Sequence, residues 1–158
     1  PMHDIGKVGI PDEILAKPGK LTDEEFQIMK THTDIGRRVL SQALDPAHPV
    51  PLLQMCIDIA HGHHERYDGK GYPRRIRGEG IPLSARIIAL VDAYDAITSR
   101  RRYKDAKPHE QAVEIIRCEA GRHFDPVIVD AFLRCESRFN EVRKRFEESA
   151  ALVGADRS

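Results

Sequence analysis

The chain has 158 residues, of which 41% are hydrophobic, and this is enough for one well-buried core. Its 25 basic residues balance its 25 acidic residues, and this neutral charge argues against a broad surface that binds duplex nucleic acid. The three cysteines form no Cys-x-x-Cys pattern, which argues against a disulfide scaffold or zinc ribbon and is typical of the reducing cytoplasm. No apolar run approaches the roughly 20 residues of a membrane span, so we expect a cytoplasmic protein without a membrane segment.

Proline and glycine separate a series of helical patterns in the first half of the chain. Hardly any of the sequence alternates as a strand would, so we predict an all-α fold. One short helix could form within 11–16. Thr22 and Glu25 match a capping box that opens a helix, or a broken helix, to about residue 41. Pro51 suits the first turn of a helix over 51–66.

The second half begins with a loop. Residues 67–82 hold four glycines and two prolines, too many for a regular element, and a loop of this length is often functional. A helix is expected over 83–100 and another over 108–121. Asp125 and Pro126 suit the N-cap and first turn of the next one. The fold should therefore contain about six to seven helices.

Charges of both signs mingle from residue 136 to residue 149, which predicts a helix that is solvated or faces a partner. We therefore divide the chain into a helical domain, 1–135, and a charged C-terminal helical extension, 136–158. The first residue is Pro1 rather than an initiator methionine. We expect the chain to be a piece of a longer protein.

Histidines on the helix expected over 51–66 are the first sign of chemistry. Helical spacing places His63 and His64 on two adjacent apolar stripes, so both imidazoles should point into the core. The same spacing places His61 and Glu65 on the polar face. A single core histidine is usually a hydrogen-bonded structural residue, but two adjacent ones are harder to satisfy and could instead bind two metal ions.

The helix expected over 83–100 is apolar almost all round, which predicts a central, buried position. Asp92 and Asp95 lie on one face of it. A buried carboxylate requires a metal, a cation or several donors, because leaving it unpaired is costly. An ion pair with Arg86 is the structural alternative to a metal for both.

The start of the chain places an imidazole next to a carboxylate, in His3 and Asp4. Gly6 follows as the expected C-terminal glycine of a helix, with Lys7 immediately after it. Imidazole and carboxylate ligands suit Fe, Mn or Zn, and a carboxylate can bridge two ions. The pair is common by chance and gains weight only from the other motifs.

Together these motifs resemble the HD-GYP family, and the resemblance extends from His3 to about Phe132. The matching segments are His3-Asp4-Ile5-Gly6-Lys7, His32 within Met29-Lys30-Thr31-His32, His63-His64-Glu65, Asp68-Gly69-Lys70-Gly71-Tyr72-Pro73 and Asp92-Ala93-Tyr94-Asp95-Ala96. The resemblance implies an all-α domain of the HD superfamily that hydrolyses cyclic di-GMP to linear pGpG, GMP or both. It also implies a site with two or three divalent metal ions, commonly iron or manganese.

Six metal ligands follow from the resemblance: His3, Asp4, His32, His63, His64 and Asp92. Helical spacing selects only three of these, and by itself it would make His32 a surface residue on an amphipathic helix. At such a site a metal-activated water would attack phosphorus in line. Asp4 is the candidate for the carboxylate shared between metals.

The substrate contacts also follow from the resemblance. Lys7 should contact the scissile phosphate, and Arg101 and Lys104 should make similar contacts. Gly71 and Tyr72 should bind the substrate as well, with Gly71 allowing the backbone to approach the nucleotide closely. Between residues 74 and 107, nine lysines and arginines stand against four acidic residues, which indicates a basic zone for an anionic ligand; a solvated face is the alternative.

Two departures from the family pattern limit the expectation. The segment Arg101-Arg102-Tyr103-Lys104 stands where active members usually carry Arg-Pro-Tyr-Lys. Family members also take a histidine, and with three metals a glutamate, from a helix before the His-Asp pair. We expect this chain to lack that helix and at least one ligand.

Three functions are compatible with the sequence. The first is an active cyclic di-GMP phosphodiesterase in a regulator with an upstream sensory or receiver domain. The second is a catalytically silent module that binds a cyclic dinucleotide, or a protein such as a diguanylate cyclase domain, through the loop 67–82. The third is an HD-superfamily phosphohydrolase that acts on another nucleotide. In each case the chain could form a homodimer.

Overall fold

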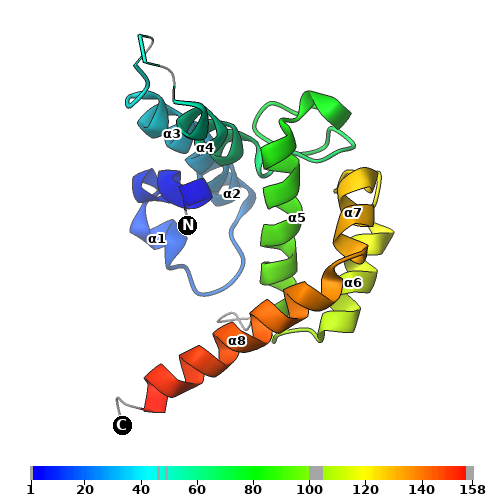
Figure 1. Cartoon of the computed structure of the whole chain (residues 1–158). Helices are drawn as coiled ribbons and strands as arrows, with labels where there is room; N and C mark the ends of the chain where they lie inside the picture. Colours follow the sequence, from blue (N-terminus) through cyan, green and yellow to red (C-terminus); the bar gives the residue numbers. More distant parts are fainter. Residues whose placement is uncertain (1, 46, 49, 100–104, 156–158) are drawn as a thin grey trace.

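The computed structural model describes residues 2–45, 47–48, 50–99 and 105–155, and every regular element within these ranges is helical (Figure 1). The all-α prediction is confirmed. The elements in chain order are η1 (Met2–Gly9), α1 (Asp12–Leu15), α2 (Asp23–Lys30), α3 (His32–Ser41), α4 (Pro51–Gly62), η2 (Gly78–Gly80), α5 (Leu83–Thr98), α6 (His109–Cys118), α7 (Pro126–Leu133) and α8 (Glu136–Ala155). The two η elements are 3-10 helices.

The long helix α5 stands in the middle of the molecule (Figure 1). On one side of it α4 packs against α5, and η1 and α3 pack in turn against α4. On the other side α6 and α7 pack against α5 and against each other. None of the described helices is long and apolar enough to cross a lipid bilayer.

Local capping signals act as the sequence predicts. The Thr22 hydroxyl accepts a hydrogen bond from the Glu25 N–H, and the Glu25 carboxylate accepts one from the Thr22 N–H, which completes the capping box of α2. The expected helix to residue 41 is broken at Thr31 into α2 and α3. At the start of α7, the Asp125 carboxylate accepts from the Val127 N–H at 2.8 Å.

The second oxygen of Asp125 forms a short ion pair with Arg86, whose Nε also donates to the Ile81 carbonyl at 2.9 Å. Arg86 therefore ties α5 to α7, and it is not the partner of Asp92 or Asp95. Asp95 is exposed, and it accepts a hydrogen bond from Ser99. It needs no metal, so the prediction of a buried, partner-dependent Asp95 was wrong.

Helix α5 is buried on some faces only. Ala85, Leu90 and Tyr94 are buried, whereas Leu83 is 58% and Ile87 42% exposed. The prediction that α5 is buried all round was wrong because, in the described part of the chain, the helices packed on it leave part of its surface uncovered. An apolar composition by itself does not say how many neighbours a helix has.

The main core cluster lies between α5, α6 and α7, and Phe139 of α8 packs against it. Close by, the Tyr94 hydroxyl meets His109 Nδ1 at 2.9 Å, and His109 Nε2 forms a short hydrogen bond with Glu136. These contacts fix the first turns of α8 to the core. The division of the chain into residues 1–135 and an extension of 136–158 stays a prediction.

Candidate metal centre

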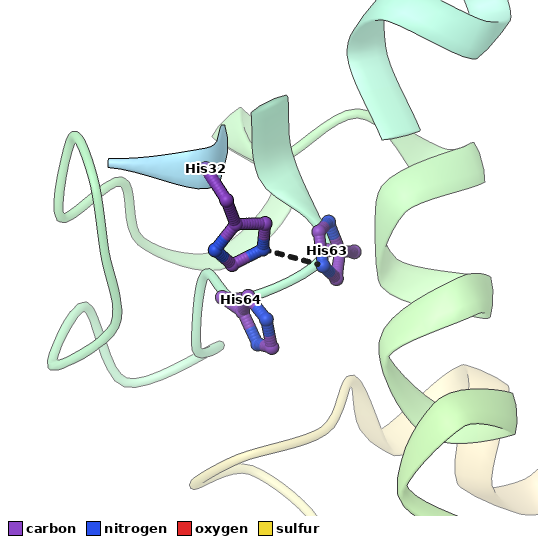
Figure 2. A group of neighbouring side chains, drawn as sticks. All are labelled: His32, His63 and His64. Atoms are coloured by element: carbon purple, nitrogen blue, oxygen red, sulfur yellow. Dashed lines mark hydrogen bonds between the residues drawn. The ribbon is translucent and has the colours of Figure 1, made fainter. Parts of the chain in front are cut away.

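Three histidines from two segments converge beside α5 (Figure 2). His32 begins α3, His63 is the C-cap of α4, and His64 follows it directly. One ligand atom from each lies within 4.8 Å of the others. Helix α4 ends at Gly62, earlier than predicted, so His63 and His64 leave the helix at its C-terminus instead of occupying two stripes of it.

A second group joins the first through His63. His3, Asp4 and His63 also offer ligand atoms within 4.8 Å of one another. The Asp4 carboxylate lies 3.5 Å from His3 Nε2, 3.7 Å from His32 Nε2 and 3.9 Å from His63 Nε2. Asp4 therefore lies between the two groups of candidate ligands, and its role as a carboxylate shared between metals stays a prediction.

Asp92 completes the arrangement from α5. One of its carboxylate oxygens lies 3.7 Å from His3 Nε2, and its side chain is 35% exposed. All six side chains named as ligands from the sequence thus meet in one place, although they come from four parts of the chain. Their role as ligands stays a prediction.

The tautomers of two of these histidines are set by backbone carbonyls. His32 Nδ1 donates to the Met29 carbonyl at 2.7 Å, and His63 Nδ1 donates to the Ile59 carbonyl at 3.0 Å. The two Nε2 atoms lie 3.5 Å apart, and the proton of each neutral ring is already on Nδ1. Two lone pairs therefore face each other, an arrangement that a cation between them would stabilise.

The charge states of the cluster suit metal ligation. Burial, together with the neighbouring imidazoles, lowers the pKa of His63 to about 4 and that of His64 to about 2. Burial also lowers the pKa of His32. For Asp4, burial raises the pKa, but the hydrogen bond and charge of Lys7 outweigh it, and the pKa lies below its ordinary value. Neutral imidazoles and an ionised carboxylate are the forms that bind divalent metals.

A close backbone contact brings His3 and Asp4 to the histidines. A Cβ at Gly6 would lie 1.9 Å from the His32 carbonyl oxygen and 2.4 Å from the Gly36 nitrogen. Gly6 does not end a helix, since η1 continues to Gly9, and the prediction of a C-terminal glycine was wrong. Its role is to let η1 approach α3.

The loop after α4 folds around a buried carboxylate. Glu65 is 2% exposed, and its two oxygens accept the N–H groups of Arg74 and Ile76 at 2.8 and 3.1 Å. The prediction of Glu65 on a polar helix face was wrong because the helix has already ended. The loop returns so that the Tyr72 N–H donates to the His64 carbonyl, and the Tyr72 ring stacks on the His64 ring at 4.7 Å.

Replacing Glu65 by glutamine is expected to lower the free energy of unfolding by about 1–3 kcal/mol, because one of the two backbone N–H groups would then face an amide donor. Chemical denaturation of both proteins measures the difference. Glu79→Gln, at an exposed position of the same loop, is the matched control. Equal denaturation midpoints for the Glu65 variant and the parent would show that this carboxylate does not anchor the loop.

His61 differs from its prediction as well. It was expected on an exposed face, but it is buried, and its Nε2 donates to Asp34 at 3.1 Å. Because α3 packs against α4, the face that would be polar in an isolated helix is covered. His61 belongs to neither group of candidate ligands. Its hydrogen bond to Asp34 links α4 to α3 and accounts for its buried position.

The residues expected to bind substrate are only partly placed. Lys7, with a side chain 42% exposed, holds its Nζ 2.7 Å from Asp4 at the edge of the cluster. Gly71 is buried, and a Cβ there would lie 2.4 Å from the Arg66 nitrogen, so this glycine serves the fold of the loop. Arg101 and Lys104 lie outside the described residues.

Sequence reasoning missed a cavity of about 840 Å³ beside His64 and Tyr72. It also missed Lys30 and Phe26, which line this cavity from α2. Lys30 stands in the Met29-Lys30-Thr31-His32 segment of the resemblance, but no role was predicted for it or for Phe26, because their position depends on how α2 meets the loop 67–82. The only sequence signal was the composition of that loop, which marked one wall of the cavity.

Known proteins are similar to this chain over most of its length. Residues 1–128 match the HD domain family. A cyclic di-GMP phosphodiesterase of Vibrio cholerae serotype O1 is 49% identical over 150 residues, which cover 95% of this chain and 30% of that protein. The cyclic di-GMP phosphodiesterase response regulator RpfG of Xanthomonas campestris pv. campestris is 44% identical over 154 residues, 98% of this chain and 39% of that protein.

A third relative, the 3'3'-cGAMP-specific phosphodiesterase 2 of Vibrio cholerae serotype O1, is 43% identical over 143 residues, 90% of this chain and 26% of that protein. The chain therefore spans less than half the length of each of these relatives. The family match covers most of the chain and includes both candidate ligand groups. The chain belongs to the HD domain family, and its His63-His64-Glu65 and Gly71-Tyr72-Pro73 segments identify it as an HD-GYP domain.

Proposed function

We propose that the protein containing this chain hydrolyses cyclic di-GMP to linear pGpG, GMP or both, with two or three divalent ions, iron or manganese, held by His3, Asp4, His32, His63, His64 and Asp92. The observation that carries the proposal is the position of Asp4, whose carboxylate lies within 4 Å of three imidazole nitrogens. A carboxylate between two groups of imidazoles can hold two ions close together, as a phosphodiester-cleaving centre with two metals would use them.

Ions bound there would supply an activated water and Lewis-acid stabilisation of the phosphate oxygens. The other functions belong to the chain itself. Lys7 places an exposed ammonium group at the edge of the cluster, where it can contact a phosphate oxygen while Asp4 holds it in position. The carbonyls of Met29 and Ile59 keep the imidazoles of His32 and His63 in the ligating tautomer.

Since the chain spans only part of its relatives, we extend the proposal to the rest of the protein. An upstream sensory or receiver domain would regulate the phosphodiesterase, as expected of a two-component regulator in the cytoplasm. The loop 67–82 would contact a diguanylate cyclase domain, and the protein would form a homodimer. The response-regulator relative supports the receiver domain, and no other comparison bears on these partners.

One purified sample of the full-length protein tests the central claim. Elemental analysis should find at least two iron or manganese ions per chain, and chromatography should show cyclic di-GMP converted to pGpG or GMP. Binding of cyclic di-GMP without hydrolysis by a fully metallated sample would overturn the enzymatic proposal and favour a silent binding module. Hydrolysis of other nucleotides but not of cyclic di-GMP would favour a different phosphohydrolase.

A further inference from the structure

The cavity of about 840 Å³ beside the metal centre is not explained by metal binding. Helix α2, the start of α3 and the loop around Tyr72 form its walls, and His64 lines it from the side of the metal cluster. A cyclic dinucleotide is larger than the phosphodiester that is cleaved. Whatever part of the ligand extends past His64 must therefore enter this cavity or turn away from the protein.

The wall of the cavity combines two aromatic rings with one ammonium group. Phe26 and Tyr72 meet edge to face, with ring centroids 6.2 Å apart. Lys30 Nζ lies 4.8 Å from the centre of the Phe26 ring and 5.7 Å from that of Tyr72. Phe26 is 42% exposed and so offers a ring against which a base can stack. A flat, aromatic group with acceptors on its edge fits this wall.

Lys30 has N–H groups that can donate to acceptors on the edge of a base. Its ammonium group donates to Gln27 Oε1 at 3.2 Å, which accounts for one of its three N–H bonds. No carboxylate of the described residues forms an ion pair with it. An ammonium group only donates, so it prefers guanine, with acceptors at O6 and N7, over adenine, which has a donor at N6.

Two further cations stand at the cavity mouth. Lys70 and Arg75 are exposed lining residues, and neither forms an ion pair among the described residues. Arg66, in contrast, is held by Asp68 and Glu119. The lining residue Asp34 accepts a hydrogen bond from His61 and adds one negative charge, which Lys30, Lys70 and Arg75 outnumber. The net charge of the residues that line the cavity is therefore positive, which suits the phosphate that accompanies a base.

We propose that this cavity binds one base of the cyclic dinucleotide and that Lys30 makes guanine the preferred base there. The inference rests on the proposed function and deepens it, since it names the residue that sets base preference. The base held in the cavity also determines which of the two phosphodiester bonds lies at the metal centre. A mixed substrate should therefore be opened mainly at one bond.

The test uses 3'3'-cGAMP, which has one guanine and one adenine, and the full-length protein loaded with Mn²⁺. Opening at one bond gives pApG and opening at the other gives pGpA, so the ratio of these first products reports which base occupies the cavity. The wild-type protein should form one product in excess by on the order of tenfold, the discrimination expected of a good contact to a base edge. Lys30→Met should bring the ratio close to one.

Lys20→Met is the matched control, because Lys20 is exposed and does not line the cavity. It should keep the wild-type product ratio. Bis(p-nitrophenyl) phosphate, which has no purine base, should be hydrolysed equally by all three proteins. A ratio near one in the wild-type protein, or an unchanged ratio in Lys30→Met, would overturn the proposal. So would a loss of bis(p-nitrophenyl) phosphate hydrolysis in Lys30→Met, since Lys30 would then act on the metal centre.

A binding measurement separates this proposal from the proposed function. If the metallated wild-type protein hydrolyses neither substrate, the phosphodiesterase assignment fails, but calorimetry with GMP and AMP on EDTA-treated protein still tests the cavity. GMP should bind more tightly than AMP by on the order of tenfold, and Lys30→Met should remove the difference. Equal binding of both nucleotides by the wild-type protein would overturn the base preference.

Discussion

Replacing His63 by alanine is expected to abolish detectable hydrolysis of cyclic di-GMP and to weaken metal binding by more than about 100-fold. His63 is the member that both candidate ligand groups share, so its loss removes a ligand from each. Substitution of a residue that only hydrogen-bonds to a metal ligand lowers metal affinity roughly 10–100-fold. The loss of a ligand itself should lower metal affinity by more than this. Metal content after dialysis and product formation measure the two effects.

His48→Ala is the matched control for this substitution. The His48 side chain is 84% exposed, its partner among the described residues is Asp45, and it belongs to neither group of candidate ligands. It should leave metal content and turnover unchanged. Circular dichroism of the His63 variant is needed beside the assays, because His63 is buried and a misfolded protein would also be inactive. A folded His63→Ala protein with undiminished turnover would contradict the proposed centre.

A methyl group at Gly6 is expected to be the most damaging small change in the fold. The Gly6→Ala Cβ would fall 1.9 Å from the His32 carbonyl oxygen, and backbone atoms of a packed helix cannot move aside as a side chain can. We expect the free energy of unfolding to fall by about 3 kcal/mol. Metal affinity should fall as well, because η1 would carry His3 and Asp4 away from His32 and His63.

Gly36→Ala tests the same helix contact from the other side. A Cβ at Gly36 would meet its nearest neighbours at 3.4 Å, so the contact should tolerate it with a small change in stability. Chemical denaturation of the three proteins gives the comparison. If Gly6→Ala and Gly36→Ala were equally stable, close packing of η1 on α3 would not be what holds the two halves of the centre together.

The sequence predicted best those elements whose signals are local. The capping box at Thr22 and the N-cap at Asp125 depend on residues two or three positions away, and both form as expected. Helical spacing also predicted core positions for His63 and Asp92, and of these His63 is buried while the Asp92 side chain is 35% exposed. It failed at Glu65, because helix α4 ends at Gly62 and the rule that relates residue i to i+4 holds only while the helix continues.

The remaining errors come from contacts between distant segments. His61 is buried by α3, and Arg86 pairs with Asp125 across 39 positions of the chain. The periodic spacing of residues along one helix does not show which residues of other helices they will contact. His32 shows the same limit, since spacing on its own helix made it a surface residue while the fold buries it at 1% exposure. Only the family resemblance identified it, because a family motif retains the outcome of tertiary packing.

The position at which helix α4 ends also bears on the order in which metal ions and nucleotide bind. His63 caps a 12-residue helix, and the C-terminus of a helix carries a partial negative charge of roughly half a unit. Asp4 and Asp92 place two carboxylates at the same position, so the centre attracts cations. In the phosphodiesterase that we propose, metal ions would therefore have to bind before the scissile phosphate could approach these carboxylates, and metal supply would control when hydrolysis begins.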